Sequence, residues 1–151
     1  MISEDEKLGL SNRFKVDVGG VDLGSWTKCD GLKVDFKTEK RTSGGQYAYI
    51  YWLPKQIEWG KVSLTRAMTA KGASTMRSWL SSKAEEYNDI GGNLAYKDGT
   101  ATIALYDAHG GQIINWELRG VHVEGWKVST FDAGKTSIAL ETLTLCHEGF
   151  L

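Results

Sequence analysis

Apolar and polar side chains alternate along much of this chain, as they do on strands that bury one face and keep the other wet. The alternation is clear at residues 14–18 and clearest at residues 32–39, where apolar residues or Thr alternate with charged ones. A glycine pair at 19–20 predicts a tight turn, and residues 21–23 a second short strand. The first part of the chain is therefore predicted to consist of short antiparallel strands.

A change of pattern follows at residues 42–46, which hold turn residues without strand or helix periodicity and are predicted to form a flexible loop. Beyond it, Tyr47, Tyr49 and Tyr51 occupy alternate positions, so they form a row on one face of a strand. Ordinary packing of aromatic side chains in a sheet explains such a row. A contact surface is the alternative, because tyrosine is enriched in interface cores.

The middle of the chain is predicted to hold another strand and a helix. Pro54 is expected to end the strand with the tyrosines, and residues 57–64 to form the next strand, with a bulge at Gly60. At residues 70–87 apolar side chains recur three or four positions apart, opposite serine and charged residues, which predicts a helix covering one open side of a sheet. The glycine pair at 91–92 lies beyond its end.

Strand patterns return in the C-terminal part. Residues 101–105 and 114–118 alternate, and a turn at 109–111 joins them, which predicts a hairpin. Residues 121–128 are predicted to form a further strand with a bulge at Gly125.

The last strand is predicted at residues 138–146, and its apolar pattern slips. Ile138 and Leu140 share one phase, whereas Leu143 and Leu145 have the other. Such a slip indicates a bulge or a strand that is buried on both faces.

Together these segments predict a single domain over residues 1–151: a mainly β protein of about eight antiparallel strands with one packed α-helix, closed as a β-barrel or packed as a sandwich. A length of 151 residues with 41% hydrophobic content agrees with one core. Eighteen glycines against one proline also favour many hairpins, because glycine supplies turns and proline removes ladder donors.

Charge and targeting signals narrow the classes of function. Lys and Arg total 18 and Asp and Glu 19, so the net charge of −1 argues against strong nucleic-acid binding, which needs a basic surface. The acidic start lacks a secretory signal, and no apolar run approaches the ~20 residues of a membrane helix. Assembly in the cytoplasm without a membrane anchor is expected. Cys29 and Cys146 are expected to be buried free thiols.

Patterns of catalytic chemistry are missing from the sequence. His109, His122 and His147 lack the spacing of a metal site, and there is neither a nucleophile elbow nor a phosphate-binding loop. No metal and no cofactor is expected. Carboxylates on or beside strands leave an acid–base pair open as an alternative. The six tryptophans leave a small-molecule-binding β-barrel open as well, although their spread along the chain favours core and interface positions.

Short motifs in a consistent order relate the chain to a known family. The N-terminal and middle motifs are Phe14-x-Val16-x-Val18-Gly19-Gly20, Cys29-Asp30-Gly31-Leu32 and Trp59-Gly60-x-Val62-x-Leu64-Thr65-Arg66. The C-terminal motifs, which are the most specific, are Ile103-x-Leu105-x-Asp107, Trp116-x-Leu118, Phe131-Asp132-Ala133, Ser137-Ile138-Ala139 and His147-Glu148-Gly149-Phe150-Leu151. In this order they resemble, nearly from end to end, the inner tube proteins of contractile phage tails and related contractile injection systems. Lys55 departs from the family, in which glycine usually follows Leu-Pro.

The resemblance implies a tail-tube fold and a structural subunit, not an enzyme. Such proteins form hexameric rings that stack into a hollow tube, and the strands of all subunits join in one barrel around the lumen. The implied partners are further copies of the chain, a sheath protein, baseplate and spike proteins, and a tape-measure protein with cargo effector or DNA in the lumen. The implied location is a phage tail or an injection particle released outside the cell. A type VI secretion tube-like ring protein is the closest alternative.

Contact residues are assigned on the same basis. The edges at which rings adapt to each other are expected in the flexible loop, the tyrosine row and the tail, with the candidates Ser43, Gly44, Gly45, Tyr47, Tyr49, Tyr51, His147, Glu148 and Phe150. The lumen is expected to be lined by residues 32–39 and 138–146. The lumen-facing candidates are Lys33, Asp35, Lys37 and Glu39.

Overall fold

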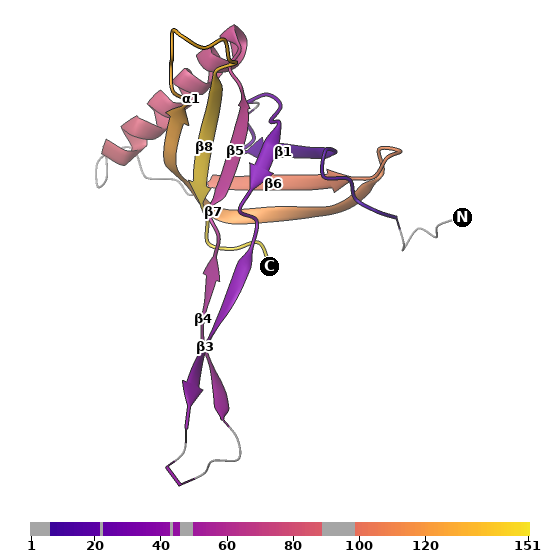
Figure 1. Cartoon of the computed structure of the whole chain (residues 1–151), viewed down its shortest axis with the longest axis vertical. Coiled ribbons are helices and arrows are strands. Elements are labelled where there is room, and N and C mark those ends of the chain that lie inside the picture. The colour runs from indigo at the N-terminus through magenta and orange to yellow at the C-terminus, as the bar shows by residue number, and fades with distance from the viewer. Residues whose placement is uncertain (1–6, 22, 43, 46–49, 89–98) are drawn as a thin grey trace.

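The computed structural model describes residues 7–21, 23–42, 44–45, 50–88 and 99–151, and Figure 1 shows their arrangement. Within these residues every strand pair is antiparallel. The elements are β1 (Phe14–Val18), β2 (Lys28–Asp30), β3 (Val34–Arg41), β4 (Tyr51–Trp59), β5 (Val62–Ala67), α1 (Ala70–Asn88), β6 (Gly99–Tyr106), β7 (Gln112–Val128) and β8 (Leu140–Cys146). Eight antiparallel strands and one packed helix confirm the predicted mainly β class.

Six of the strands form one sheet in the order β1-β6-β7-β8-β5-β2. The 17-residue strand β7 belongs to both halves of this sheet, because its first part pairs with β6 and its last part with β8. Between these parts it bends, so that β6 runs across the view of Figure 1 while β8 and β5 run along the long axis. The two halves of the sheet thus fold towards each other around a common core.

The bend in β7 is centred on Gly120. Its φ of 58° lies in the left-handed region that favours glycine, and the register with β6 shifts at the same place. A second register shift, with β8, confirms the bulge predicted at Gly125. The prediction of separate strands at 114–118 and 121–128 is wrong, because these irregularities bend one strand without ending it.

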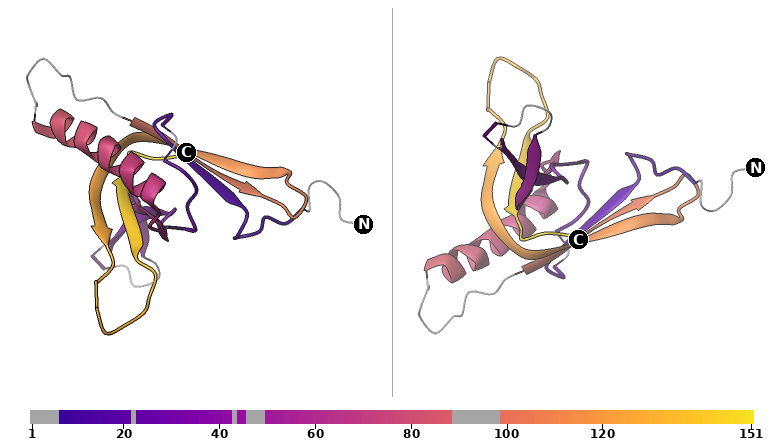
Figure 2. Two further views of the ribbon diagram at one scale, coloured as in Figure 1. Left: turned by 90° about the horizontal axis from the view of Figure 1, so that it is seen from above. Right: turned by 90° about the horizontal axis from the view of Figure 1, so that it is seen from below.

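The core lies between the folded sheet and α1. Met76 and Trp79 of the helix are 1% and 9% exposed and pack with side chains from both halves of the sheet. Figure 2 shows α1 lying across the strands β5, β7 and β8. The helix predicted at 70–87 is confirmed. The apolar sheet residues that are at most 1% exposed are Val62, Leu64, Leu118, Leu143 and Leu145.

Strands β3 and β4 form a separate hairpin that projects far from the body, downwards in Figure 1. At its base Trp59 packs on Phe150, with ring centres 4.9 Å apart. Further out, the cross-strand pair Phe36 and Ile57 is 64% and 51% exposed. The alternation at residues 32–39 predicted an apolar face on a core. Along most of β3 this face is instead exposed, because the hairpin leaves the body.

Pro54 and Gly60 contradict the predictions made for them. Pro54 does not end a strand but lies within β4, beside a register shift with β3. A two-stranded hairpin tolerates proline because each strand has a free edge. Residues 57–64 are not one strand with a bulge, because β4 ends before Gly60 and β5 begins after it. The N–H of Gly60 donates to the carbonyl of Lys33 at 3.0 Å and ties the hairpin base together.

The second short strand predicted at residues 21–23 is also wrong. Among the described residues of this segment, which exclude residue 22, only a single bridge between Val18 and Val21 forms, and Leu23 lies in the core at 4% exposure. The glycine pair predicted to follow the helix, at 91–92, lies outside the described residues.

Candidate functional site

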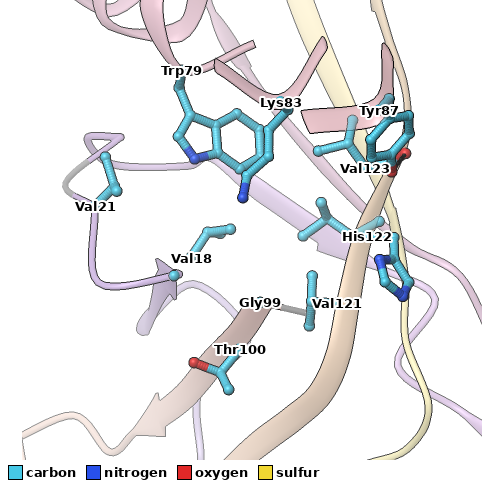
Figure 3. A pocket seen from close by; sticks show the side chains of 12 residues that line it. Val18, Val21, Trp79, Lys83, Tyr87, Gly99, Thr100, Val121, His122 and Val123 are labelled. Atoms are coloured by element: carbon cyan, nitrogen blue, oxygen red, sulfur yellow. Dashed lines mark hydrogen bonds between the residues drawn. The ribbon is translucent and has the colours of Figure 1, made fainter. Parts of the chain in front are cut away.

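A small internal cavity lies between α1 and the strands β1, β6 and β7 (Figure 3). Its volume is about 70 Å³, and its wall is mostly apolar, with Val18, Trp79 and Val121 grouped around it. Ligand sites are larger, at roughly 300–1,000 Å³. The other hollows found in the described part of the chain have volumes of about 220 to 500 Å³, and all of them are open grooves at the surface, the one of about 500 Å³ lying beside α1. The internal cavity is too small for a small-molecule ligand, which argues against the alternative of a small-molecule-binding barrel.

The described histidine and cysteine side chains do not form a metal site, and His147 makes hydrogen bonds that hold the backbone. Among the described residues, no three His, Cys, Asp or Glu side chains gather as a metal site requires. The Nδ1 atom of His147 accepts the N–H of Gly149 at 3.1 Å, so its Nε2 donates to the carbonyl of Gly60, 2.8 Å away. Burial lowers the pKa of His147. Cys29 and Cys146 are free and half-buried, and burial raises the pKa of Cys29 to about 11.

A buried ion pair joins two core strands, and the pattern of the sequence does not predict it. Arg66 of β5 and Glu141 of β8 pair with side chains only 7% and 1% exposed. The second carboxylate oxygen of Glu141 accepts the indole N–H of Trp126 at 3.2 Å. The guanidinium donates to the carbonyl of Leu23 and lies 4.3 Å from the centre of the Trp26 ring. The ion pair has one signal in the sequence. The apolar pattern of the last strand slips in phase, and Glu141 occupies a position that faces the core.

Strands β1 and β2 stand at the two ends of the hydrogen-bonded order. Each has one edge without a partner strand among the described residues. At the two ends of β1, the N–H of Tyr106 donates to the carbonyl of Arg13 at 2.8 Å, and the N–H of Gly19 donates to the carbonyl of Thr100 at 2.6 Å. The odd-numbered residues of β1 therefore bond to β6, and the even-numbered ones do not. The N–H and C=O of Val16 thus point away from β6, towards the free edge. Such an edge is a template for pairing with another chain.

The projecting hairpin presents a second surface that the body does not cover. Phe36, Ile57 and Trp52 are between 51% and 64% exposed on it. Exposed apolar side chains gathered on one element mark an interaction surface. Tyr51 starts β4 and is 45% exposed, and the contact interpretation of the tyrosine row stays a prediction.

The remaining candidates of the loop lie at the hairpin tip or cannot be placed. Gly44 and Gly45 form a turn between β3 and β4. Ser43, Tyr47 and Tyr49 lie outside the described residues.

The tail candidates lie at the opposite end of the hairpin, at its base. His147 bonds Gly60, and Phe150 packs on Trp59. The N–H of Glu148 donates to the carbonyl of Arg119 at 2.7 Å and fixes the tail to the bend of β7. His147 and Phe150 therefore connect the base of the hairpin to the tail, and Glu148 connects the tail to β7.

The lumen candidates Asp35, Lys37 and Glu39 alternate along β3 and share one face of the hairpin, and Lys33 directly precedes the strand in the same alternation. Lys33 lies 3.6 Å from Asp35, and Lys37 lies 3.6 Å from Glu58 on β4. The predicted lumen strand 138–146 contains β8, which lies inside the sheet between β5 and β7.

Comparison with known proteins agrees with the resemblance that the motifs indicated. The family model of the T4-like virus tail tube protein gp19 matches residues 10–151. No curated protein matches the chain. Within the described residues, no helix combines the length and the apolar character needed to cross a membrane.

Several solved structures share the fold. A chain of the six-fold symmetrised baseplate of the anti-feeding prophage has a TM-score of 0.73 at 18% identity, over 93% of this chain and 92% of its own. A chain of the sheath–tube complex of PVC, an extracellular contractile injection system, has a TM-score of 0.71 at 21% identity, over 93% and 88%. A chain of the tube-terminating cap of the anti-feeding prophage has a TM-score of 0.72 at 20% identity, over 94% and 88%.

Proposed function

The chain belongs to the family of the T4-like virus tail tube protein gp19, and from this premise we propose that it forms hexameric rings that stack into the inner tube of a contractile injection system. Its role is structural and not enzymatic, as family and fold agree. The observation that carries the proposal is the open six-stranded sheet, which ends on β1 at one side and on β2 at the other.

Ring formation follows from these two different edges. The edge of β1 in one copy meets the edge of β2 in the next, so the contact joins two unlike surfaces. A contact of this kind closes into a ring when the rotation between copies allows it. Pairing also covers backbone donors and acceptors that are exposed in a single copy. The proposed ring has six copies, in keeping with the six-fold baseplate whose chain shares this fold.

Stacking of rings is assigned to the hairpin of β3 and β4. It extends along the long axis of the molecule, away from the body (Figure 1). Its exposed pair Phe36 and Ile57 is then buried against the ring below, together with the candidates Gly44, Gly45 and Tyr51 at and near the tip. Ser43, Tyr47 and Tyr49 complete this proposed contact.

The proposed partners are based on the assemblies in which proteins of the same fold occur. One such protein occurs in a sheath–tube complex and another in a baseplate. We assign to this chain a sheath protein around the tube, baseplate and spike proteins at one end, and a tape-measure protein with cargo inside. Assembly would take place in the cytoplasm, before the particle acts as part of a phage tail or an extracellular device.

Sedimentation and electron microscopy of the purified protein test the proposal. Rings or tubes are expected at high protein concentration. A Val16→Pro variant should stay folded but fail to form them, because it removes an N–H that points to the free edge and not to β6. Val16→Ala is the matched control, since it trims the same side chain and keeps the N–H. A wild-type protein that stays monomeric with sheath and baseplate proteins present contradicts the proposal.

A further inference from the structure

One face of the sheet is built from short hydroxyl side chains. Ser63 pairs with Thr144 and Thr65 with Thr142 across β5 and β8. These residues alternate with the buried Val62, Leu64, Leu143 and Leu145, so they point away from the core. The hydroxyl oxygens of Thr65 and Thr142 are 3.4 Å apart. Because α1 packs on the core side, this hydroxyl face lies on the other side of the sheet from the helix.

The charged side of the hairpin continues this face. Val34 pairs with Trp59, and the Trp59 ring contacts Phe150, which packs on the core. Lys33 and Asp35 alternate with Val34 and therefore point to the side away from the core. This is the same side as the hydroxyl face.

Charged side chains of both signs occur in nearly equal number on this side of the molecule, and three ion pairs form among them. Lys33 pairs with Asp35 and Lys37 with Glu58, each at 3.6 Å. Lys61, which precedes the hydroxyl face, pairs with Glu124 at 2.5 Å. Glu39 and Arg41 continue the same face of β3, and Lys28, Asp30 and Lys127 lie opposite Thr65, Ser63 and Thr142. Together with the three ion pairs, this side carries six cations and five anions.

A surface of this composition is suited to stay wet. Interface cores are enriched in aromatic residues and Met, whereas Ser and Lys are depleted. The apolar side chains of the hairpin point to its opposite face, as Phe36 and Ile57 show. The hydroxyl face and the charged side chains beside it together are called the wall below. Leu140, 42% exposed, lies at the rim of the wall.

We infer that the wall lines the channel of the assembled tube and that its nearly balanced charge lets polypeptides of either sign pass without being held. This inference rests on the proposed function. Exposed ion pairs contribute little to stability, so the wall lysines and carboxylates stabilise the subunit little. Their effect is to cancel most of the field in the channel. A channel lined by an excess of one sign would attract and hold polypeptides of the other sign, so cargo that varies in sign is best served by no large excess.

Gold labelling locates the wall in the tube. Thr144→Cys and, as a control on α1, Ser82→Cys are made in a protein that lacks Cys29 and Cys146, and assembled tubes are treated with maleimide-linked gold clusters. Electron microscopy should show gold along the central axis for Thr144→Cys and along the outer surface for Ser82→Cys. Tubes that carry the Thr144→Cys gold outside, or leave this thiol unreactive, overturn the inference. A protein that forms no tubes would instead count against the proposed function.

Charge variants test the balance of the wall. Wild-type tubes should retain neither short polyglutamate nor short polylysine at low salt in co-sedimentation. Asp35→Lys with Glu58→Lys should raise retention of polyglutamate at least tenfold, and Lys33→Glu with Lys37→Glu should do so for polylysine. Exchanging Lys37 and Glu58 for one another keeps the balance and should change neither. Wild-type tubes that hold either probe as strongly as the variants contradict a balanced wall.

Discussion

Arg66 and Glu141 face each other across β5 and β8 and bond through Nε and a carboxylate oxygen inside the core. Glu141 takes a position at which the alternation of β8 requires a buried residue, followed by Leu143 and Leu145 on the same face. The slip of apolar phase in this strand is therefore neither a bulge nor burial of both faces. It arises because Leu140 is exposed and the first core position of the strand is polar.

Breaking this ion pair should destabilise the subunit strongly. Glu141→Leu leaves the guanidinium of Arg66 buried without its carboxylate, and removal of one partner of a buried pair costs about 3–5 kcal/mol. Replacing both residues, Arg66→Met with Glu141→Leu, should recover most of this loss because no charge remains buried. Urea unfolding of the three proteins measures the effect. Equal stability of the single and double variants would rule out this interpretation of the pair.

The exposed apolar pair of the hairpin should matter for assembly and not for the fold. Phe36→Ser removes a side chain that is 64% exposed in the single subunit, so its free energy of unfolding should change by no more than ~0.5 kcal/mol. Tube formation should be lost, as sedimentation will show. Lys55→Ser, at an exposed position on the other strand of the hairpin, β4, is the control that should assemble normally. Normal tubes from Phe36→Ser would remove the hairpin from the proposed ring-to-ring contact.

His147 should make stability depend on pH. Burial lowers its folded pKa below the ordinary value of 6.5, so the unfolded chain binds the proton more tightly. The contribution of neutral His147 is thus present above pH 6.5 and is lost as the pH falls from there through the lowered folded pKa. His147→Gln should flatten this part of the profile of unfolding free energy against pH. A profile identical to that of the wild type would show that another group titrates.

Gly31 should not tolerate a side chain. Its φ is 93°, and an added Cβ would lie 1.9 Å from the carbonyl oxygen of Lys61. Gly31→Ala is expected to cost more than about 2 kcal/mol, because backbone strain and a clash with backbone add together. Gly45→Ala is the matched control, with φ 88° and nothing within 4 Å of the added atom. If both variants lose the same stability in urea unfolding, the clash at Gly31 does not contribute.

Local alternation was enough to predict much of the fold. The strand at residues 14–18, the helix and the hairpin of β6 and β7 each have a regular period and a core to pack on, so period and burial agree. The match of the family model confirms the resemblance that short motifs indicated.

The predictions from sequence were wrong where the conformation or burial of a residue depends on a contact with a distant part of the chain. Pro54 sits in a strand because that strand belongs to a two-stranded hairpin, which local propensity does not reveal. Gly120 bends β7 instead of ending it, since β6 and β8 continue the sheet on either side. Glu141 is buried because Arg66, far away in the sequence, neutralises it.

Assembly surfaces are even less accessible from the sequence. Phe36 and Ile57 carry the same apolar pattern as core residues, and only the projection of the hairpin distinguishes them. The wall follows from pairing between β5 and β8, which sequence alone does not establish.

A helical reconstruction of the assembled protein by electron cryomicroscopy tests the central claim most directly. The account predicts that the free edge of β1 in each subunit is hydrogen-bonded to β2 of its neighbour, so that the sheets join around one shared channel. A map in which both edges face solvent, with subunits joined through other surfaces, would contradict it.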